Sequence, residues 1–181
     1  MKRGPLLFSV LSSAAAAAWL SIACSSSPST SDKITVVGPN PGDFSSTIGG
    51  VGPVFERHCG SFDCHGNPSR AMRIYSQNGL RLPNEAGIVP GTAATTPDEV
   101  SANYRSIIAV EPEQMNQVVK NNADVYSLLI TKKPLNNPSV GGEVHKGGTV
   151  MIKGDDTDKC VTGWLKGTVD KNACVSAAQL P

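Results

Sequence analysis

Two cysteines with a histidine directly after the second are the feature that most constrains what this chain can fold into. Cys59 and Cys64 enclose four residues, Gly60-Ser61-Phe62-Asp63, and His65 follows at once. This junction is typical of a c-type haem site, in which each thiol adds to a porphyrin vinyl group and the imidazole coordinates the iron. The usual form has two residues between the cysteines, so the longer spacing leaves a local disulfide with a bystander histidine as the alternative.

The beginning of the sequence predicts export. Lys2 and Arg3 precede an apolar run over 6–20, which is too short and too rich in alanine and serine for a comfortable membrane span. We therefore expect a signal peptide over 1–23.

The residues at the expected cleavage site resemble the lipobox of bacterial lipoproteins, because small Ser21 and Ala23 precede Cys24. The resemblance implies lipidation of Cys24, and several acyl chains on one residue would anchor the protein stably to a membrane. An ordinary signal peptide with a chance cysteine is the alternative. Since Ser25 and not Asp follows, we expect an exported bacterial lipoprotein at the periplasmic face of the outer membrane or at the cell surface.

Composition divides the mature chain into a tether and one domain. Residues 24–52 are rich in Ser, Thr, Pro and Gly, which predicts a lipid-anchored flexible linker. Residues 53–175 have the size of one small domain. Without Lys2 and Arg3, the 16 basic and 15 acidic residues become 14 and 15. This near-neutral balance gives no electrostatic reason to bind nucleic acid.

The 5 cysteines can be assigned in two ways. In one, Cys24 carries lipid, Cys59 and Cys64 hold haem, and Cys160 pairs with Cys174. In the other, Cys59 and Cys64 form a disulfide of their own. Both predict the Cys160–Cys174 disulfide, which would contribute roughly 3 kcal/mol if unstrained.

The apolar spacing predicts an all-α domain with long loops rich in glycine and proline. Thr96-Pro97-Asp98-Glu99 is a helix start with a Thr N-cap, and the acidic residues from Asp155 form another. His58 is expected to be a solvated surface residue. The expected helices cover 51–58, 97–108, 111–120, 124–132 and 155–168.

Several segments together resemble the cytochrome c-like domains of exported planctomycete and myxobacterial proteins. They are Phe55-x-x-x-Cys59, Cys64-His65-Gly66 and the later Gly79-Leu80-Arg81-Leu82. The resemblance implies a small cytochrome c-like fold and one covalent haem c, attached at both cysteines with His65 as proximal ligand. It further suggests that Arg70, Arg73 or Arg81 pairs with a haem propionate, although each alone is more simply a solvated charge. Trp164 on the last helix is expected beside the haem.

The sixth iron ligand is predicted from a second stretch. His145-Lys146-Gly147-Gly148 resembles the His-x-Gly-Gly element of the same family, which makes His145 the predicted distal ligand. Met151 is the alternative, because methionine is common at this position and raises the potential. An open site, or ligation by Met115 or Met72, is a further option.

These expectations combine into a lipoprotein that carries single electrons outside the cytoplasm and is not an enzyme. Its partners would be redox proteins and, through the lipid, a membrane. Two alternatives stay open: a haem-free, disulfide-stabilised binding or scaffold module, and a small peroxidase-like haem enzyme. The sequence has no phosphate-binding glycine loop and no further His or Cys pair to complete a zinc site.

Overall fold

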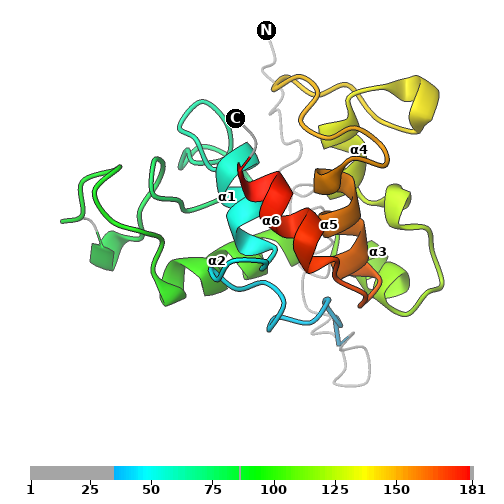
Figure 1. Cartoon of the computed structure of the whole chain (residues 1–181), viewed down its shortest axis with the longest axis horizontal. Coiled ribbons are helices and arrows are strands. Elements are labelled where there is room, and N and C mark those ends of the chain that lie inside the picture. Colours follow the sequence, from blue (N-terminus) through cyan, green and yellow to red (C-terminus); the bar gives the residue numbers. More distant parts are fainter. Residues whose placement is uncertain (1–34, 86, 180–181) are drawn as a thin grey trace, which may run out of the picture. The chain divides into compact units, whose positions relative to one another are not determined.

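A computed structural model describes residues 35–85 and 87–179 of the chain (Figure 1). This part consists of helices and loops, with a single bridge between Tyr75 and Leu80 in place of any strand, so the predicted all-α class is confirmed. None of its helices is both long and apolar enough to cross a membrane. The elements are α1 (Gly52–Cys59), η2 (Pro83–Glu85), α2 (Pro97–Ile108), α3 (Pro112–Val119), η3 (Val125–Ser127), α4 (Leu129–Leu135), η4 (Pro138–Val140), α5 (Asp156–Leu165) and α6 (Lys171–Gln179).

The predicted start of α2 is confirmed by its hydrogen bonds. Thr96 Oγ1 accepts from the main-chain N–H of Glu99 at 3.3 Å, and Glu99 Oε2 accepts from the N–H of Thr96 at 3.0 Å. This reciprocal pair is a capping box, which satisfies donors that the first helical turn would otherwise leave open.

The single helix expected over 124–132 is wrong. Asp124 caps the short η3 turn by accepting from Tyr126 N–H at 3.0 Å, and Leu128 is extended between η3 and α4. The carboxylate of Glu111 accepts from Leu129 N–H at 2.5 Å, which starts α4 at this point. Side-chain bonding from two acids therefore divides an apolar stretch that would otherwise continue as one helix.

The helical unit is longer than the 53–175 expected from composition. It begins at Val36, so residues 36–52 are not part of a tether. Phe44 is 2% exposed because its ring packs on Trp164, with centroids 5.3 Å apart, and Trp164 Nε1 donates to Asn40 O at 3.1 Å. The predicted signal peptide, 1–23, and the lipidation site, Cys24, lie outside the described residues.

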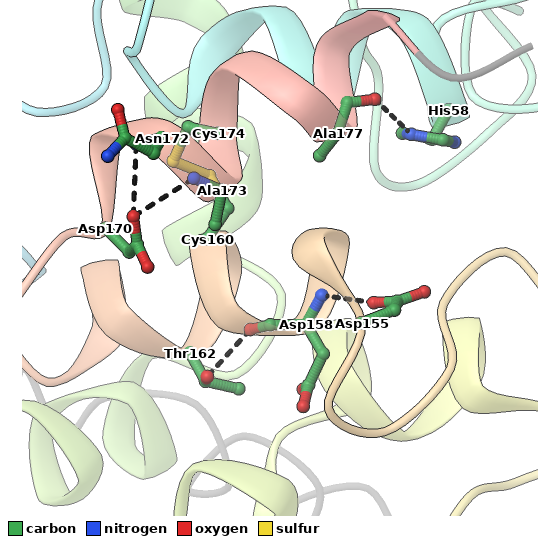
Figure 2. The surroundings of a disulfide bond; sticks show 10 residues. All are labelled: His58, Asp155, Asp158, Cys160, Thr162, Asp170, Asn172, Ala173, Cys174 and Ala177. Atoms are coloured by element: carbon green, nitrogen blue, oxygen red, sulfur yellow. Dashed lines mark hydrogen bonds between the residues drawn. A yellow bond between two sulfur atoms is a disulfide. The ribbon is translucent and has the colours of Figure 1, made fainter.

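The C-terminal helix closes the domain (Figure 2). A disulfide joins Cys160 of α5 to Cys174 of α6, as predicted. His58 of α1 is half-buried and its Nε2 lies 2.9 Å from the carbonyl oxygen of Ala177, so the prediction of a solvated His58 is wrong. Figure 1 shows α6 lying against both α1 and α5. The segment Lys171–Gln179 is thus a packed helix, in which Ala177 is fully buried.

Candidate functional site

The segment from Cys59 to His65 is a compact turn at the end of α1. The main-chain N–H of His65 donates to Cys59 O at 2.8 Å. Inside this turn, the N–H groups of Cys64 and Gly66 both donate to Ser61 O, at 3.0 and 2.9 Å. The four intervening residues are therefore folded back on themselves, and the second cysteine and the histidine return to the end of the helix.

Close packing against Gly60 holds this turn in place. Ser76 Oγ donates to Gly60 O at 2.7 Å, and the N–H of Ile74 donates to His65 O at 2.9 Å. A Cβ atom on Gly66 or Gly79 would collide with the Gly60 carbonyl. Glycine is thus required at both positions by the approach of one main-chain segment to another.

The turn forms one wall of a cavity of about 710 Å³. This volume lies within the usual range for small-molecule and cofactor sites, roughly 300–1,000 Å³. Cys59, Cys64, His65 and His145, the four predicted haem-site residues, all line it. The lining is mostly apolar and includes Phe55, Met72, Val110, Ile130 and Val150.

The two cysteines at the cavity are free thiols, and both are half-buried. Burial raises the pKa of Cys59 to about 12, with the neighbouring Cys64 as a smaller cause. Cys59 is therefore a protonated thiol at neutral pH. The local disulfide of the alternative cysteine assignment is not formed in this structure.

The two histidines of the cavity face one another. The rings of His65 and His145 are nearly parallel, with an interplanar angle of 8° and centroids 6.3 Å apart. His65 Nδ1 lies 3.0 Å from Met72 O, and His145 Nδ1 lies 3.2 Å from Gly148 O. Since a carbonyl only accepts, each Nδ1 carries the proton, and each Nε2 carries the lone pair of the neutral ring.

The surroundings of His65 favour its neutral form. Burial lowers the pKa of His65, and the nearby charges of His145 and Arg70 lower it further, against the opposing effect of the hydrogen bond to Met72. A neutral imidazole is the form that coordinates a metal. A main-chain carbonyl on Nδ1 is also the usual outer partner of a metal-bound histidine, because it fixes both tautomer and ring orientation.

The loop that carries His145 is fastened to α4. Asn136 ends α4 in a left-handed conformation, and its Oδ1 accepts from the main-chain N–H of His145 at 2.7 Å. Glu143 N–H donates to Lys132 O at 3.0 Å, and the N–H of Val150 donates to Pro134 O at 2.9 Å. The imidazole is thus positioned by main-chain bonds on both sides of it.

The other predicted ligands and contacts are placed differently. Met151 is 1% exposed and Met115 is likewise buried, and neither lines the cavity, whereas Met72 does. Trp164 packs with Phe44 and not on the cavity wall, contrary to expectation.

Of the three arginines suggested as propionate partners, Arg70 lines the cavity. Arg81 is instead buried in an ion pair with Glu99, and Arg73 lines a separate surface pocket. Sequence reasoning missed two further cations at the cavity, Lys133 and Lys146. The position of Lys146 beside His145 was a usable signal, whereas nothing local indicated Lys133.

The donor set does not resemble a compact metal site. Within the described part of the chain, no three His, Cys, Asp or Glu side chains converge to hold an ion. The cavity instead presents two opposed imidazoles and two thiols around a large apolar space, which fits a flat group that supplies most of its own metal ligands. Comparison with family models, curated proteins and solved structures found no match to this chain.

Proposed function

We propose that this protein is an exported, cytochrome c-like electron carrier with one covalent haem c. The relation between the His65 and His145 rings is the observation that carries the proposal. Each ring has its Nδ1 held by a main-chain carbonyl and its Nε2 left for a metal, so the two imidazoles of this cavity would be able to hold one haem iron together. The two ring centroids are 6.3 Å apart, and the ring planes are almost parallel.

The thiols support the same interpretation. Cys59 and Cys64 lie on the wall that also carries His65, and both are unpaired. Thiols at these positions would add to the two vinyl groups, while Arg70 and Lys146 would hold the carboxylates of the propionates. The residues required by the proposal therefore belong to one cavity, although they are up to 87 positions apart in the sequence, from Cys59 to Lys146.

The iron would supply the one-electron chemistry, and the chain's own residues bind the group, orient it and exclude water. His145 opposite His65 would occupy the sixth position, which disfavours the peroxidase-like alternative because that activity needs an open iron site. We expect a lower reduction potential than methionine would give. The proposal also includes lipidation of Cys24, a location at the outer membrane or cell surface, and redox proteins as partners.

The direct test is the mass of the exported protein, made in a host with a haem-attachment system. We expect the polypeptide plus one haem, retained after denaturation, with a low-spin ferrous spectrum that carbon monoxide leaves unchanged. The matched control is the Cys59→Ser/Cys64→Ser double variant, which should lose the covalent mass. A colourless product of polypeptide mass, with Cys59 and Cys64 oxidised to a disulfide, would refute the proposal in favour of the haem-free module.

A further inference from the structure

We propose that a second pocket, built around Arg73 and Arg105, binds a small external oxyanion such as phosphate or a carboxylate. This shallow surface pocket has a volume of about 320 Å³. Besides the two arginines, Tyr75, Ser106, Ala71 and Ala102 line it. Nothing in the proposed electron-carrier function uses this pocket, so the inference goes beyond that function.

The charges of the pocket favour an anion. Arg73 and Arg105 are both exposed, and no ion pair of the described residues involves either of them. No acidic side chain lines the pocket. Arg105 lies in the last turn of α2, where the helix dipole favours a cation, but Arg73 has no such compensation. Two cations at one pocket repel each other, and an anion between them would remove this repulsion.

The polar groups of the pocket are suited to donate. The main-chain N–H of Arg73 donates to Ser106 Oγ at 2.8 Å, so the hydroxyl hydrogen of Ser106 is available for another acceptor. The Tyr75 hydroxyl can also donate, and a guanidinium binds carboxylate or phosphate oxygens through two parallel N–H bonds. The small side chains of Ala71 and Ala102 leave room for the ligand.

The pocket is held in shape before any ligand binds. The main chain of Tyr75 is bonded twice to the buried side chain of Asn103: its N–H donates to Oδ1 at 2.6 Å, and its carbonyl accepts from Nδ2 at 2.7 Å. Since Asn103 and Ser106 both belong to α2, the two sides of the pocket are fixed relative to each other. Preorganisation of this kind reduces the ordering cost of binding.

The pocket also adjoins the larger cavity, because Ala71 and Ser106 line both. A bound anion would therefore place negative charge beside the proposed haem and lower its potential. Binding itself requires only the arginines and hydroxyls. If the protein carried no haem, the anion-binding test could still succeed. If no anion bound, the haem proposal would be unaffected.

The test is a titration of the purified protein with inorganic phosphate and with citrate, followed through the Nε–Hε NMR signals of its arginines. We expect saturable shifts at Arg73 and Arg105 with one site per chain, which chloride at the same ionic strength does not produce. Arg73→Gln and Arg105→Gln should each weaken binding at least tenfold. Lys166→Gln removes an exposed charge outside the pocket and should change the affinity less than twofold.

Three results would overturn the proposal. The first is a shift that chloride reproduces, which would indicate general screening. The second is unchanged affinity in both arginine variants. The third is a pair of arginine signals that phosphate and citrate do not move, as expected if a haem propionate already fills the pocket. Both arginines are exposed, so neither substitution should prevent folding, and the titration of the unsubstituted protein needs no variant.

Discussion

The main-chain N–H of His65 donates to the carbonyl of Cys59 over 2.8 Å, and this bond brings the two ends of the cysteine-histidine segment together. With it in place, the four residues after Cys59 form a closed turn and add little distance between the thiols and the imidazole. The unusual spacing is therefore compatible with both cysteines and His65 lining one cavity. The turn depends on glycines that bring main-chain segments into contact.

Gly66→Ala is expected to destabilise the protein by about 1–3 kcal/mol, because its Cβ would collide with the Gly60 carbonyl and the turn would have to open. Gly87→Ala is the control, since a Cβ there meets nothing within 4 Å. It should be neutral or slightly stabilising. Urea unfolding measures both free energies, and equal stabilities for the two variants would contradict the tight turn.

His145→Ala is expected to convert the loaded protein from low-spin to high-spin iron and to permit carbon monoxide binding, because it removes the proposed sixth ligand. Met151→Leu conserves the volume of a buried side chain, so it should leave the spectrum unchanged and cost less than about 1.5 kcal/mol. Absorption spectra of the ferric and ferrous proteins decide between the two residues. The reverse pattern would assign the ligand to Met151.

Much of the fold was predictable because its signals are local. The capping box at Thr96 and the acidic start at Asp155 mark helix beginnings through groups only three residues apart. Counting cysteines was sufficient to predict the Cys160–Cys174 pair. Cys59, Cys64 and His65 line one cavity, and their closeness in the chain made this grouping easy to expect.

What could not be predicted depends on contacts between distant residues. Phe44 stands in a segment whose composition resembles a linker, and only its packing on Trp164 makes that segment part of the domain. The placement of His145 opposite His65 likewise required a family resemblance, since a lone histidine among glycines carries no such signal. Arg81 looked solvated because its buried partner, Glu99, is 18 positions away.

Reduction of the Cys160–Cys174 disulfide is expected to lower the free energy of unfolding by about 3 kcal/mol, as its sequence separation of 14 residues suggests. The bridge holds α6 against α5, so its loss should also expose the amides of α6 to hydrogen exchange. Guanidinium unfolding with and without reductant measures the effect, and the Cys160→Ala/Cys174→Ala variant is the control that reductant should not affect. A change below 0.5 kcal/mol on reduction would contradict a stabilising role.

Arg81→Met is expected to cost about 3–5 kcal/mol, because it leaves the carboxylate of Glu99 buried without its partner. The Arg81 and Glu99 side chains are only 4% and 0% exposed, with 2.8 Å between Nη2 and Oε2. Lys159→Met breaks an exposed pair with Asp156 and should cost less than about 0.5 kcal/mol. Chemical denaturation distinguishes the two cases, and similar losses would mean that burial of the Arg81 pair has no energetic consequence.

Glu56 is expected to make stability fall as the pH rises from its ordinary pKa of 4.5 through its raised pKa in the folded state. Burial raises its pKa above the ordinary 4.5, the nearby Glu99 adds to this, and the Thr95 hydrogen bond and Arg81 oppose it. One carboxyl oxygen, Oε1, is buried and has no hydrogen-bond partner in the described part of the chain.

Below both pKa values the carboxyl of Glu56 is protonated in the folded and the unfolded chain. Glu56 then causes no loss in the free energy of unfolding. As the pH rises past 4.5, the unfolded chain ionises first, which lowers its free energy relative to the folded chain, until the folded pKa is also passed. Glu56→Gln cannot ionise, so the stability of the original protein minus that of this variant should decrease over the same interval. Unfolding free energies at several pH values measure this difference, and a difference that stays constant or increases with pH would show that Glu56 ionises at least as readily in the folded state as in the unfolded one.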